Sequence, residues 1–344
     1  MEFSRKKQVY DTLLNAGISG LLTSIFLLFI INFDMLSALA GFCIGFCVYL
    51  SIYTYKTIVE ARYFRHLNLI LLLILNTIIQ VLIILIFAVF FVGLIYLGGD
   101  FNAIFSQSYT NIFRGVYLVG LIYGLVLSMI FSFISIVSMI IGKNILPKLF
   151  IGKYRKPVEE ERIFMFLDIA SSTAIAEKIG HLNYLSLLND FFSDITEPMN
   201  RTKGEIYKYV GDEVIISWKM KDGIKDNNCV RCFIYIDEVI KSRSSYYNNR
   251  YGIVPGFKAG LHGGLTVIGE MGQTKREIAY IGDVMNTTSR IESECNMLQQ
   301  RLLISQDLES LLDFPGLQEA GTVKLRGKEK EMKLYSLSAD YNEK

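Results

Sequence analysis

The chain of 344 residues is long enough for two domains. Its 35 basic and 33 acidic side chains give a formal net charge of +2, and this near balance argues against a nucleic-acid partner. Hydrophobic residues make up 51% of the chain, and the longest runs without a charge lie in the first 142 residues.

Four stretches in that part contain no Asp, Glu, Lys or Arg: residues 12–33, 35–55, 67–98 and 115–142. Each reaches the roughly 20 residues that cross a bilayer as a helix. We therefore predict a four-helix transmembrane domain over residues 1–142, whose outer surface contacts membrane lipid. No small-residue cleavage site separates the first two stretches, so we expect the first to be a span and not a signal peptide.

Basic residues near these stretches gather on one side, since the connectors on the other side hold only Asp34, Asp100 and Arg114 as charged residues. They precede the first stretch, separate the second from the third, and follow the fourth: Arg5, Lys6, Lys7; Lys56, Arg62, Arg65; Lys143, Lys148, Lys153, Arg155, Lys156. Basic loops stay in the cytoplasm. The pattern predicts a multi-pass protein of the inner or plasma membrane, with both termini and the C-terminal domain cytoplasmic.

Residues 143–161 form a linker in which Pro147 and Pro157 prevent one continuous helix. Residues 162–344 then have the pattern of an α+β domain. We expect strands at 163–169, 205–210, 214–218, 257–262 (ending in a Gly-Gly pair) and 278–281, and helices at 171–179, 182–199, 228–247 and 286–301. The order strand, helix, hairpin, helix, strand is the βαββαβ order of a ferredoxin-like sheet. Cys229 and Cys232 have metal-ligand spacing but no second pair, so we interpret them as packing residues.

Two aspartates mark the ends of predicted strands. Asp168 ends the first strand, and Asp212 lies in the hairpin turn Val210-Gly211-Asp212-Glu213. Either alone could be a turn or cap residue, because Asp is favoured at both places. Together they offer hard oxygen ligands suited to Mg²⁺ and a polyphosphate.

A third motif follows the last predicted strand. Asn286 and Arg290 are four residues apart, so on a helix they share one face. An amide and a guanidinium aimed together suit a phosphate whose charge is redistributing. The alternative is that Asn286 caps the helix and Arg290 is a solvated charge.

From residue 162 to about residue 337 the chain resembles the catalytic domain of class III nucleotidyl cyclases, the family of adenylyl and guanylyl cyclases. The resemblance rests on Phe-x-Asp-Ile at residues 166–169, Lys-x-x-Gly-Asp at 208–212, and Gly-Asp-x-x-Asn-x-x-x-Arg at 282–290, in that order. It implies that ATP is cyclised to 3′,5′-cyclic AMP and pyrophosphate with two Mg²⁺ or Mn²⁺ ions per site.

The resemblance also implies a role for each matched residue. Asp168, Asp212 and the carbonyl of Ile169 would bind the metal ions, and the turn through Ser171, Ser172 and Thr173 would offer N–H groups to the phosphates. Asn286 would orient the ribose, and Arg290 would stabilise the pentavalent phosphorus. Arg326, and less directly Lys328, would bind the terminal phosphates.

Lys208 is the residue expected to read the base. Its ammonium can donate to N1 of adenine, whereas guanine carries a hydrogen there. The resemblance implies a second base-reading residue, Asp or Thr, three positions before Gly282, where this chain has Ala279. That departure removes a side-chain acceptor for the adenine amino group and leaves GTP open as a substrate.

In this family the metal aspartates come from one chain of a dimer, and the base-reading and transition-state residues come from the other. Because this chain carries the full set, the resemblance implies a head-to-tail homodimer. A diguanylate cyclase is a rival, since its Gly-Gly-Asp/Glu-Glu-Phe turn partly matches residues 210–214, but it has no use for Asn286 and Arg290. A receptor-like homologue with weak or no catalysis is a second rival.

The predicted spans could anchor, dimerise or sense. The pairs Gly41/Gly45 and Gly120/Gly124 each form a small-xxx-small face that could pack two helices closely. Short loops between the spans favour a lipophilic ligand over a protein one. No charged residue lies inside the spans, so we find no support for a channel.

Overall fold

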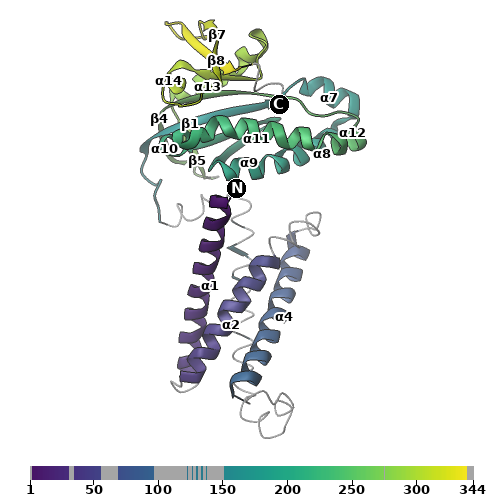
Figure 1. Cartoon of the computed structure of the whole chain (residues 1–344), viewed down its shortest axis with the longest axis vertical. Coiled ribbons are helices and arrows are strands. Elements are labelled where there is room, and N and C mark those ends of the chain that lie inside the picture. Colours follow the sequence, from purple (N-terminus) through teal and green to yellow (C-terminus); the bar gives the residue numbers. More distant parts are fainter. Residues whose placement is uncertain are drawn as a thin grey trace. The chain divides into compact units, whose positions relative to one another are not determined.

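The computed structural model describes residues 2–30, 35–55 and 69–96, seven helical positions between 122 and 137, and residues 151–338 apart from 275. The chain divides into two compact units, Met1–Lys143 and Asn144–Lys344. Each unit is described by itself (Figure 1).

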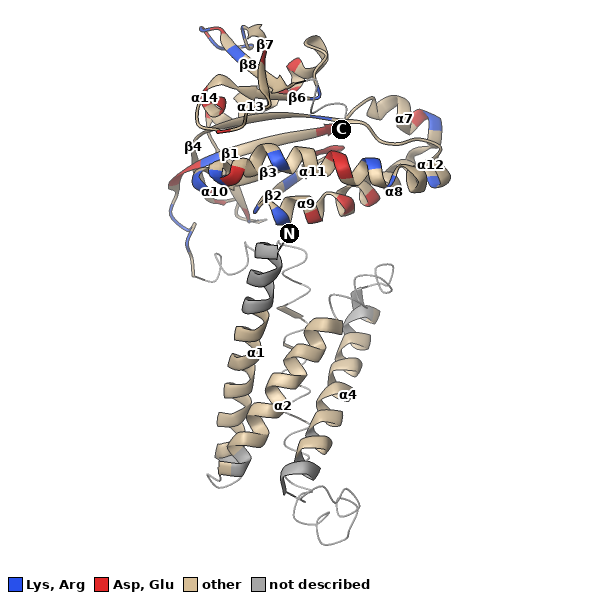
Figure 2. Ribbon diagram, viewed as in Figure 1, with Lys and Arg blue, Asp and Glu red and all other residues tan. Residues whose placement is uncertain are grey.

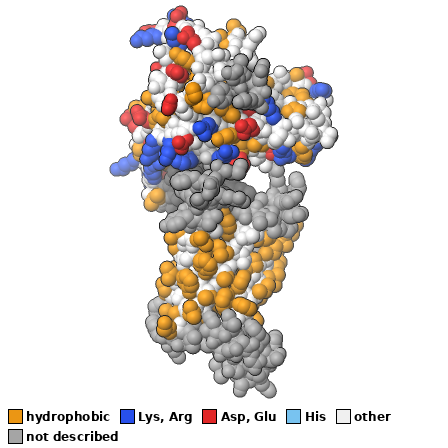
Figure 3. All heavy atoms as spheres, in the orientation of Figure 1, with side chains coloured by type: hydrophobic (Ala, Val, Ile, Leu, Met, Phe, Trp, Pro, Cys, Tyr) orange, Lys and Arg blue, Asp and Glu red, His pale blue; other side chains and the backbone are white. Residues whose placement is uncertain are grey.

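The first unit contains the helices α1 (Glu2–Ile30), α2 (Met35–Thr54) and α4 (Leu69–Tyr96). Charged residues are absent from the sequences of α2 and α4, which are uniformly tan or grey in Figure 2. Apolar side chains cover the visible face of this unit in Figure 3, and Leu21, Leu22 and Ile86 are more than half exposed.

The described residues support the expected spans only in part. Ile74–Phe91 is the one described stretch long and apolar enough to cross a bilayer by length and composition, whereas Thr12–Leu28 and Ala38–Thr54 are shorter apolar helices. The expected span at 115–142 lies mostly outside the described residues. Four spans therefore stay a prediction.

Helices α1 and α2 pack closely at the glycine pair of α2. A Cβ atom on Gly41 would lie 2.7 Å from Ser24 Cα, and one on Gly45 would lie 2.5 Å from Thr23 Oγ1. The Ser19 hydroxyl donates to the Gly45 carbonyl at 3.1 Å. The predicted small-residue face at 41/45 thus packs a helix of its own chain, while the second glycine pair falls outside the described residues.

The second unit is built on an eight-stranded sheet: β1 (Val158–Ile169), β2 (Glu205–Val210), β3 (Glu213–Lys219), β4 (Phe257–Met271), β5 (Glu277–Ile281), β6 (Leu302–Ser305), β7 (Leu317–Val323) and β8 (Met332–Leu337). Its order is β2-β3-β1-β4-β6-β8-β7, with β5 paired to β4. The first four strands are antiparallel neighbours in the order 2-3-1-4. This is the ferredoxin-like arrangement, so the predicted fold of the C-terminal unit is confirmed.

The helices of this unit are α7 (Ser172–Ile179), α8 (His181–Asp194), α9 (Thr196–Arg201), α10 (Met220–Ile224), the 3₁₀ turn η3 (Lys225–Asn227), α11 (Asn228–Ser242), α12 (Ser244–Tyr251), α13 (Asp283–Met297) and α14 (Gln306–Glu309). The single helix expected over 182–199 breaks at Ile195, because Pro198 cannot donate the N–H that would continue it. The helix expected over 228–247 likewise breaks, at Arg243.

Two expected boundaries were wrong in ways that affect the site. Strand β4 does not end at Gly263-Gly264 but continues to Met271, because both glycines pair with β1. Its extension then pairs with β5. Helix α13 begins at Asp283, so Asn286 lies within the first turn and does not cap the helix.

Side chains of β1 alternate between two apolar clusters. Ile163, Met165 and Leu167 pack with residues of α8 and α11, whereas Phe164 and Phe166 pack on the opposite face of the sheet with Val284 of α13. Both faces of the strand are therefore buried up to Leu167, and Asp168 is the first side chain at this end to reach solvent. Cys229 and Cys232 are fully buried among the first cluster, as expected of packing residues.

Candidate active site

The two predicted metal aspartates are brought together by strand register. Strands β1 and β3 pair so that Asp168 lies opposite Glu213, and β2 and β3 are joined by the two-residue turn Gly211-Asp212. Gly211 has a φ of +65°, which such turns require. The turn sets Asp212 beside the end of β1.

Crowded carboxylates give this place an excess of negative charge. Burial, together with repulsion from the charges of Asp212 and Glu292, raises the pKa of Asp168 to about 6. Burial, together with repulsion from Glu292, Asp168 and Asp212, likewise raises the pKa of Glu213 to about 7. A divalent cation beside these groups would favour their charged forms.

Lys258 and Glu292 belong to this cluster although no motif pointed to them. Lys258 lies opposite Asp168 in the β1–β4 register, and its Nζ is 3.8 Å from Asp168 Oδ2 and 2.9 Å from Glu292 Oε1. The available signal in the sequence was a lysine at the second position of a largely apolar strand. The contact with Glu292, 34 residues further along, depends on the packing of α13 and could not be inferred from spacing.

The donor set at this end of the sheet fits Mg²⁺ or Mn²⁺ bound with a polyphosphate. No trio of His, Cys, Asp or Glu side chains within the described part of the chain could hold a metal ion alone. Mg²⁺ is commonly bound by one or two carboxylates plus water and substrate phosphates. Asp168 and Asp212 provide two carboxylates, and Ile169 is the buried last residue of β1, directly after Asp168.

The expected phosphate turn directly follows these residues. Ser171 adopts a left-handed conformation with φ of 56°, and α7 begins at Ser172 with no side-chain cap. The first N–H groups of a helix lack partners within it, and they attract anions. Thr173, in the first turn, is exposed. The predicted residues of this turn therefore lie beside the metal aspartates.

A second group of predicted residues gathers on α13. The guanidinium of Arg290 packs on Gly327, where an added Cβ atom would lie 3.4 Å from Nη2. Lys328 donates to the carboxylate of Asp283, and Asn286 is exposed. The loop that carries Arg326 and Lys328 is thus folded against the Arg290 side of the helix.

The third group contains the base-reading position. Lys208 is half exposed on edge strand β2, and its Nζ lies 3.6 Å from Glu277 Oε1 on β5. Ala279, on the same strand, is buried. Strands β2 and β5 approach although three strands separate them in the sheet order: the rings of Tyr207 and Tyr280 are 4.5 Å apart.

Helix α13 separates the first two groups. At about 100° per residue, Asn286 and Arg290 point some 120–160° away from Glu292, which contacts the Lys258 of the metal side. Within one chain, one face of α13 thus points toward the metal aspartates, and a different face carries Asn286 and Arg290.

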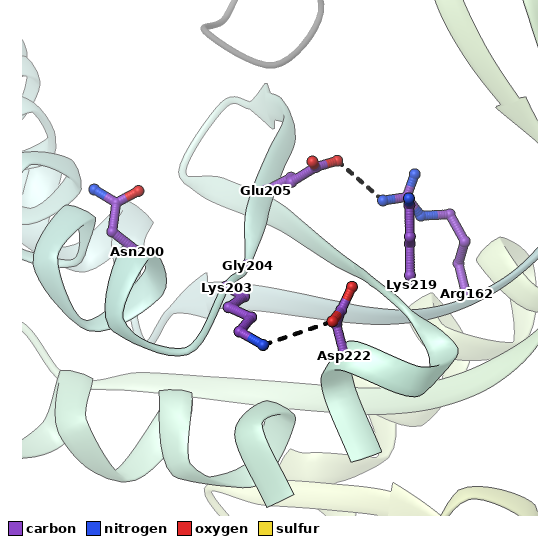
Figure 4. A pocket seen from close by; sticks show the side chains of 7 residues that line it. All are labelled: Arg162, Asn200, Lys203, Gly204, Glu205, Lys219 and Asp222. Carbon is purple, nitrogen blue, oxygen red and sulfur yellow. Dashed lines mark hydrogen bonds and ion pairs between the residues drawn. The ribbon is translucent and has the colours of Figure 1, made fainter. Parts of the chain in front are cut away.

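A polar hollow lies elsewhere in the unit. It has a volume of about 270 Å³ and is lined by Arg162, Asn200, Lys203, Gly204, Glu205, Lys219 and Asp222 (Figure 4). Its charges are largely paired within the wall: Arg162 Nη2 lies 3.0 Å from Glu205 Oε2, and Lys203 Nζ lies 3.7 Å from Asp222 Oδ1. None of the predicted site residues lines it, so it is separate from the candidate site.

Comparison with known proteins gives consistent matches. Residues 155–339 match the family described as the adenylate and guanylate cyclase catalytic domain. The chain is 37% identical over 222 residues to adenylate cyclase 2 of Rhizobium meliloti (strain 1021), covering 64% of this chain and 61% of that protein. It is 23% identical over 188 residues to an adenylate cyclase of Anabaena cylindrica, covering 51% of this chain and 36% of that protein.

A solved structure of a bacterial light-regulated adenylyl cyclase superposes with a TM-score of 0.55 at 20% identity, over 62% of this chain and 64% of that chain. This likeness concerns the fold alone. The chain spans less than two thirds of the length of each of these relatives.

Proposed function

Because the chain belongs to the adenylate and guanylate cyclase catalytic domain family, we propose that it is a membrane-anchored adenylate cyclase. It converts ATP to 3′,5′-cyclic AMP and pyrophosphate on a cytoplasmic catalytic unit. The observation that carries the proposal is the juxtaposition of Asp168 and Asp212 at the open end of β1, where burial and neighbouring carboxylates raise the pKa of Asp168 to about 6. The similarity to adenylate cyclase 2 of Rhizobium meliloti supports ATP as the substrate.

Asp168, Asp212 and the Ile169 carbonyl would hold two Mg²⁺ or Mn²⁺ ions. When bound, these ions would neutralise triphosphate charge and lower the pKa of the ribose 3′-hydroxyl. The 3′-oxygen then bonds to the α-phosphorus, the bond to the bridging oxygen of pyrophosphate breaks, and the hydroxyl proton leaves to solvent or to a carboxylate of the site. Lys258, with its Nζ 3.8 Å from Asp168 Oδ2, adds one positive charge beside these carboxylates.

The remaining residues act on the substrate itself. Asn286 orients the ribose, and Arg290 stabilises the charge that develops around the pentavalent phosphorus. The N–H groups at Ser171, Ser172 and Thr173, together with Arg326 and Lys328, bind the outer phosphates.

We propose that the site is completed across a head-to-tail homodimer. The support is the geometry of α13, whose Asn286–Arg290 face turns away from the metal side of its own chain. A second copy can bring that face, with Lys208, to the aspartates of the first. Two equivalent sites result, because a two-fold interface repeats each contact.

The N-terminal unit is proposed as a multi-pass membrane anchor in contact with lipid. Support comes from the charge-free helices α2 and α4, and from the exposed apolar side chains of α1 and α4. A lipophilic ligand bound among the helices would turn the anchor into a sensor. Equal activity of the full chain with and without added lipid extract would argue against sensing.

The direct test incubates the purified full chain with ATP or GTP and Mg²⁺ or Mn²⁺. Cyclic AMP as the main product supports the proposal. Cyclic GMP as the main product favours the alternative of a guanylate cyclase that uses the same metal site. No cyclic product from either nucleotide, with both metals, would favour a receptor-like homologue that binds without catalysis.

A further inference from the structure

Lys208 and Glu277 form an ion pair next to a position that lacks a functional group. Lys208 Nζ lies 3.6 Å from Glu277 Oε1, and the two side chains are 48% and 42% exposed. Glu277 and Ala279 are two residues apart on β5, so they project from the same face of that strand. The carboxylate that pairs with Lys208 therefore lies on the same face of β5 as Ala279, two residues before it.

The pair offers one donor and one acceptor side by side. A lysine ammonium only donates hydrogen bonds, and a carboxylate only accepts them. The Watson–Crick edge of adenine presents the acceptor N1 next to the donor N6 amino group. The corresponding edge of guanine presents the donor N1–H next to the acceptor O6. With lysine at N1, the carboxylate matches the amino group of adenine and opposes O6 of guanine.

We propose that Glu277 is a specificity-determining residue, which accepts a hydrogen bond from the N6 amino group of ATP while Lys208 donates to N1. This inference rests on the proposed function. It assigns to Glu277 the acceptor that Ala279 cannot supply. Both groups keep solvent contact in the absence of nucleotide, and their mutual ion pair holds the two side chains near each other until the base replaces it.

The test uses three substrates with the full-length chain: ATP, GTP and purine riboside 5′-triphosphate, which is ATP without the 6-amino group. We expect the wild type to prefer ATP over the purine analogue about tenfold in kcat/KM, the scale of one hydrogen bond to a charged group at a partly exposed site. Glu277→Ala should bring this preference to within about threefold by slowing ATP alone. Glu277→Gln should keep part of it, because its amide oxygen still accepts.

Activity on the purine analogue is an internal control, since it reports folding and metal chemistry without the amino group. Glu319→Ala is the matched control variant: Glu319 pairs with Lys333 at 3.1 Å on an exposed strand, and its side chain is 47% exposed. That change should leave all three substrates unaffected.

Three outcomes would overturn the inference. An unchanged ATP preference in Glu277→Ala would show that the carboxylate does not contact the base. A loss confined to GTP would show that the pair is turned round and reads guanine. Equal losses on all three substrates would make Glu277 a structural residue. By contrast, a wild-type chain inactive on every triphosphate would contradict the proposed function itself.

Discussion

Asp168 and Lys208 belong to one proposed site, but the protein holds them very differently. Asp168 is the last but one residue of a strand that is paired on both sides, and its side chain is 25% exposed beside Asp212, Glu213, Lys258 and Glu292. Lys208 lies on the edge strand, 48% exposed, with a register shift in the β2–β3 pairing just before it. The metal side is fixed by the register of the central strands, whereas the base side rests on side chains that can move. Nucleotide preference can therefore change without disturbing the chemistry.

The largest effect should come from breaking the metal side. Asp168→Ala or Asp212→Ala should lower cyclic AMP formation by about a thousandfold or more, since each removes a metal ligand. Thermal unfolding should show a native-like or higher Tm, because the change removes repulsion between carboxylates. Retention of a tenth of the activity in both variants would contradict the assignment.

Arg290→Ala should reduce kcat by roughly a hundredfold to a thousandfold with a smaller change in KM, because the guanidinium acts on the transition state. Mixing this variant with Asp168→Ala tests the dimer. In random heterodimers one site regains all its residues, so activity should return to about a quarter of wild type. No recovery on mixing and re-equilibration would argue for a site within one chain.

Lys208→Glu tests the base-reading side of the site, which rests on exposed side chains. It should shift the ATP/GTP ratio of kcat/KM toward GTP by about tenfold or more, since it replaces a donor at N1 with an acceptor. Total turnover on the better nucleotide should fall much less than in the aspartate variants. An unchanged ratio would mean that Lys208 does not read the base.

The smallest expected effect is on the pH dependence of stability, and it comes from a buried histidine of β4, the strand that also carries Lys258. His262 of this strand is buried against the Ser305 hydroxyl at 2.7 Å, and burial lowers its pKa from 6.5. The unfolded chain then binds the proton more readily. Stability from this group is present above pH 6.5 and is lost as the pH falls below that value toward the lower folded pKa.

The measurement compares the free energy of unfolding of the C-terminal unit in wild type and in His262→Asn, from denaturant titrations at pH 7.5 and pH 5.5. The difference between the two proteins isolates the histidine from Asp168 and Glu213, whose raised pKa values act in the opposite direction. An equal pH dependence in both proteins would contradict the prediction.

Local patterns predicted the parts of this site that depend on local structure. The end of β1, the turn at Asp212 and the helix of Asn286 and Arg290 follow from apolar runs, a glycine turn and helical spacing. Lys258, Glu292 and Glu277 were missed, because each acts through a residue on a strand or helix far away in sequence. Their partners depend on the register of β4 with β1 and on the return of β5 toward β2, which no local pattern contains. The spans are predicted from composition, and their number still depends on that argument.

Helix α13 has a consequence for how two sites would communicate. In the proposed dimer it touches the metal cluster of its own chain through Glu292 and supplies Arg290 to the substrate of the other. A rigid helix cannot shift at one end of this arrangement without shifting at the other. Occupancy of one site should then change the affinity of its twin, and by linkage the influence must be equal in both directions. ATP saturation curves with a Hill coefficient different from one would be the signature of a shared helix.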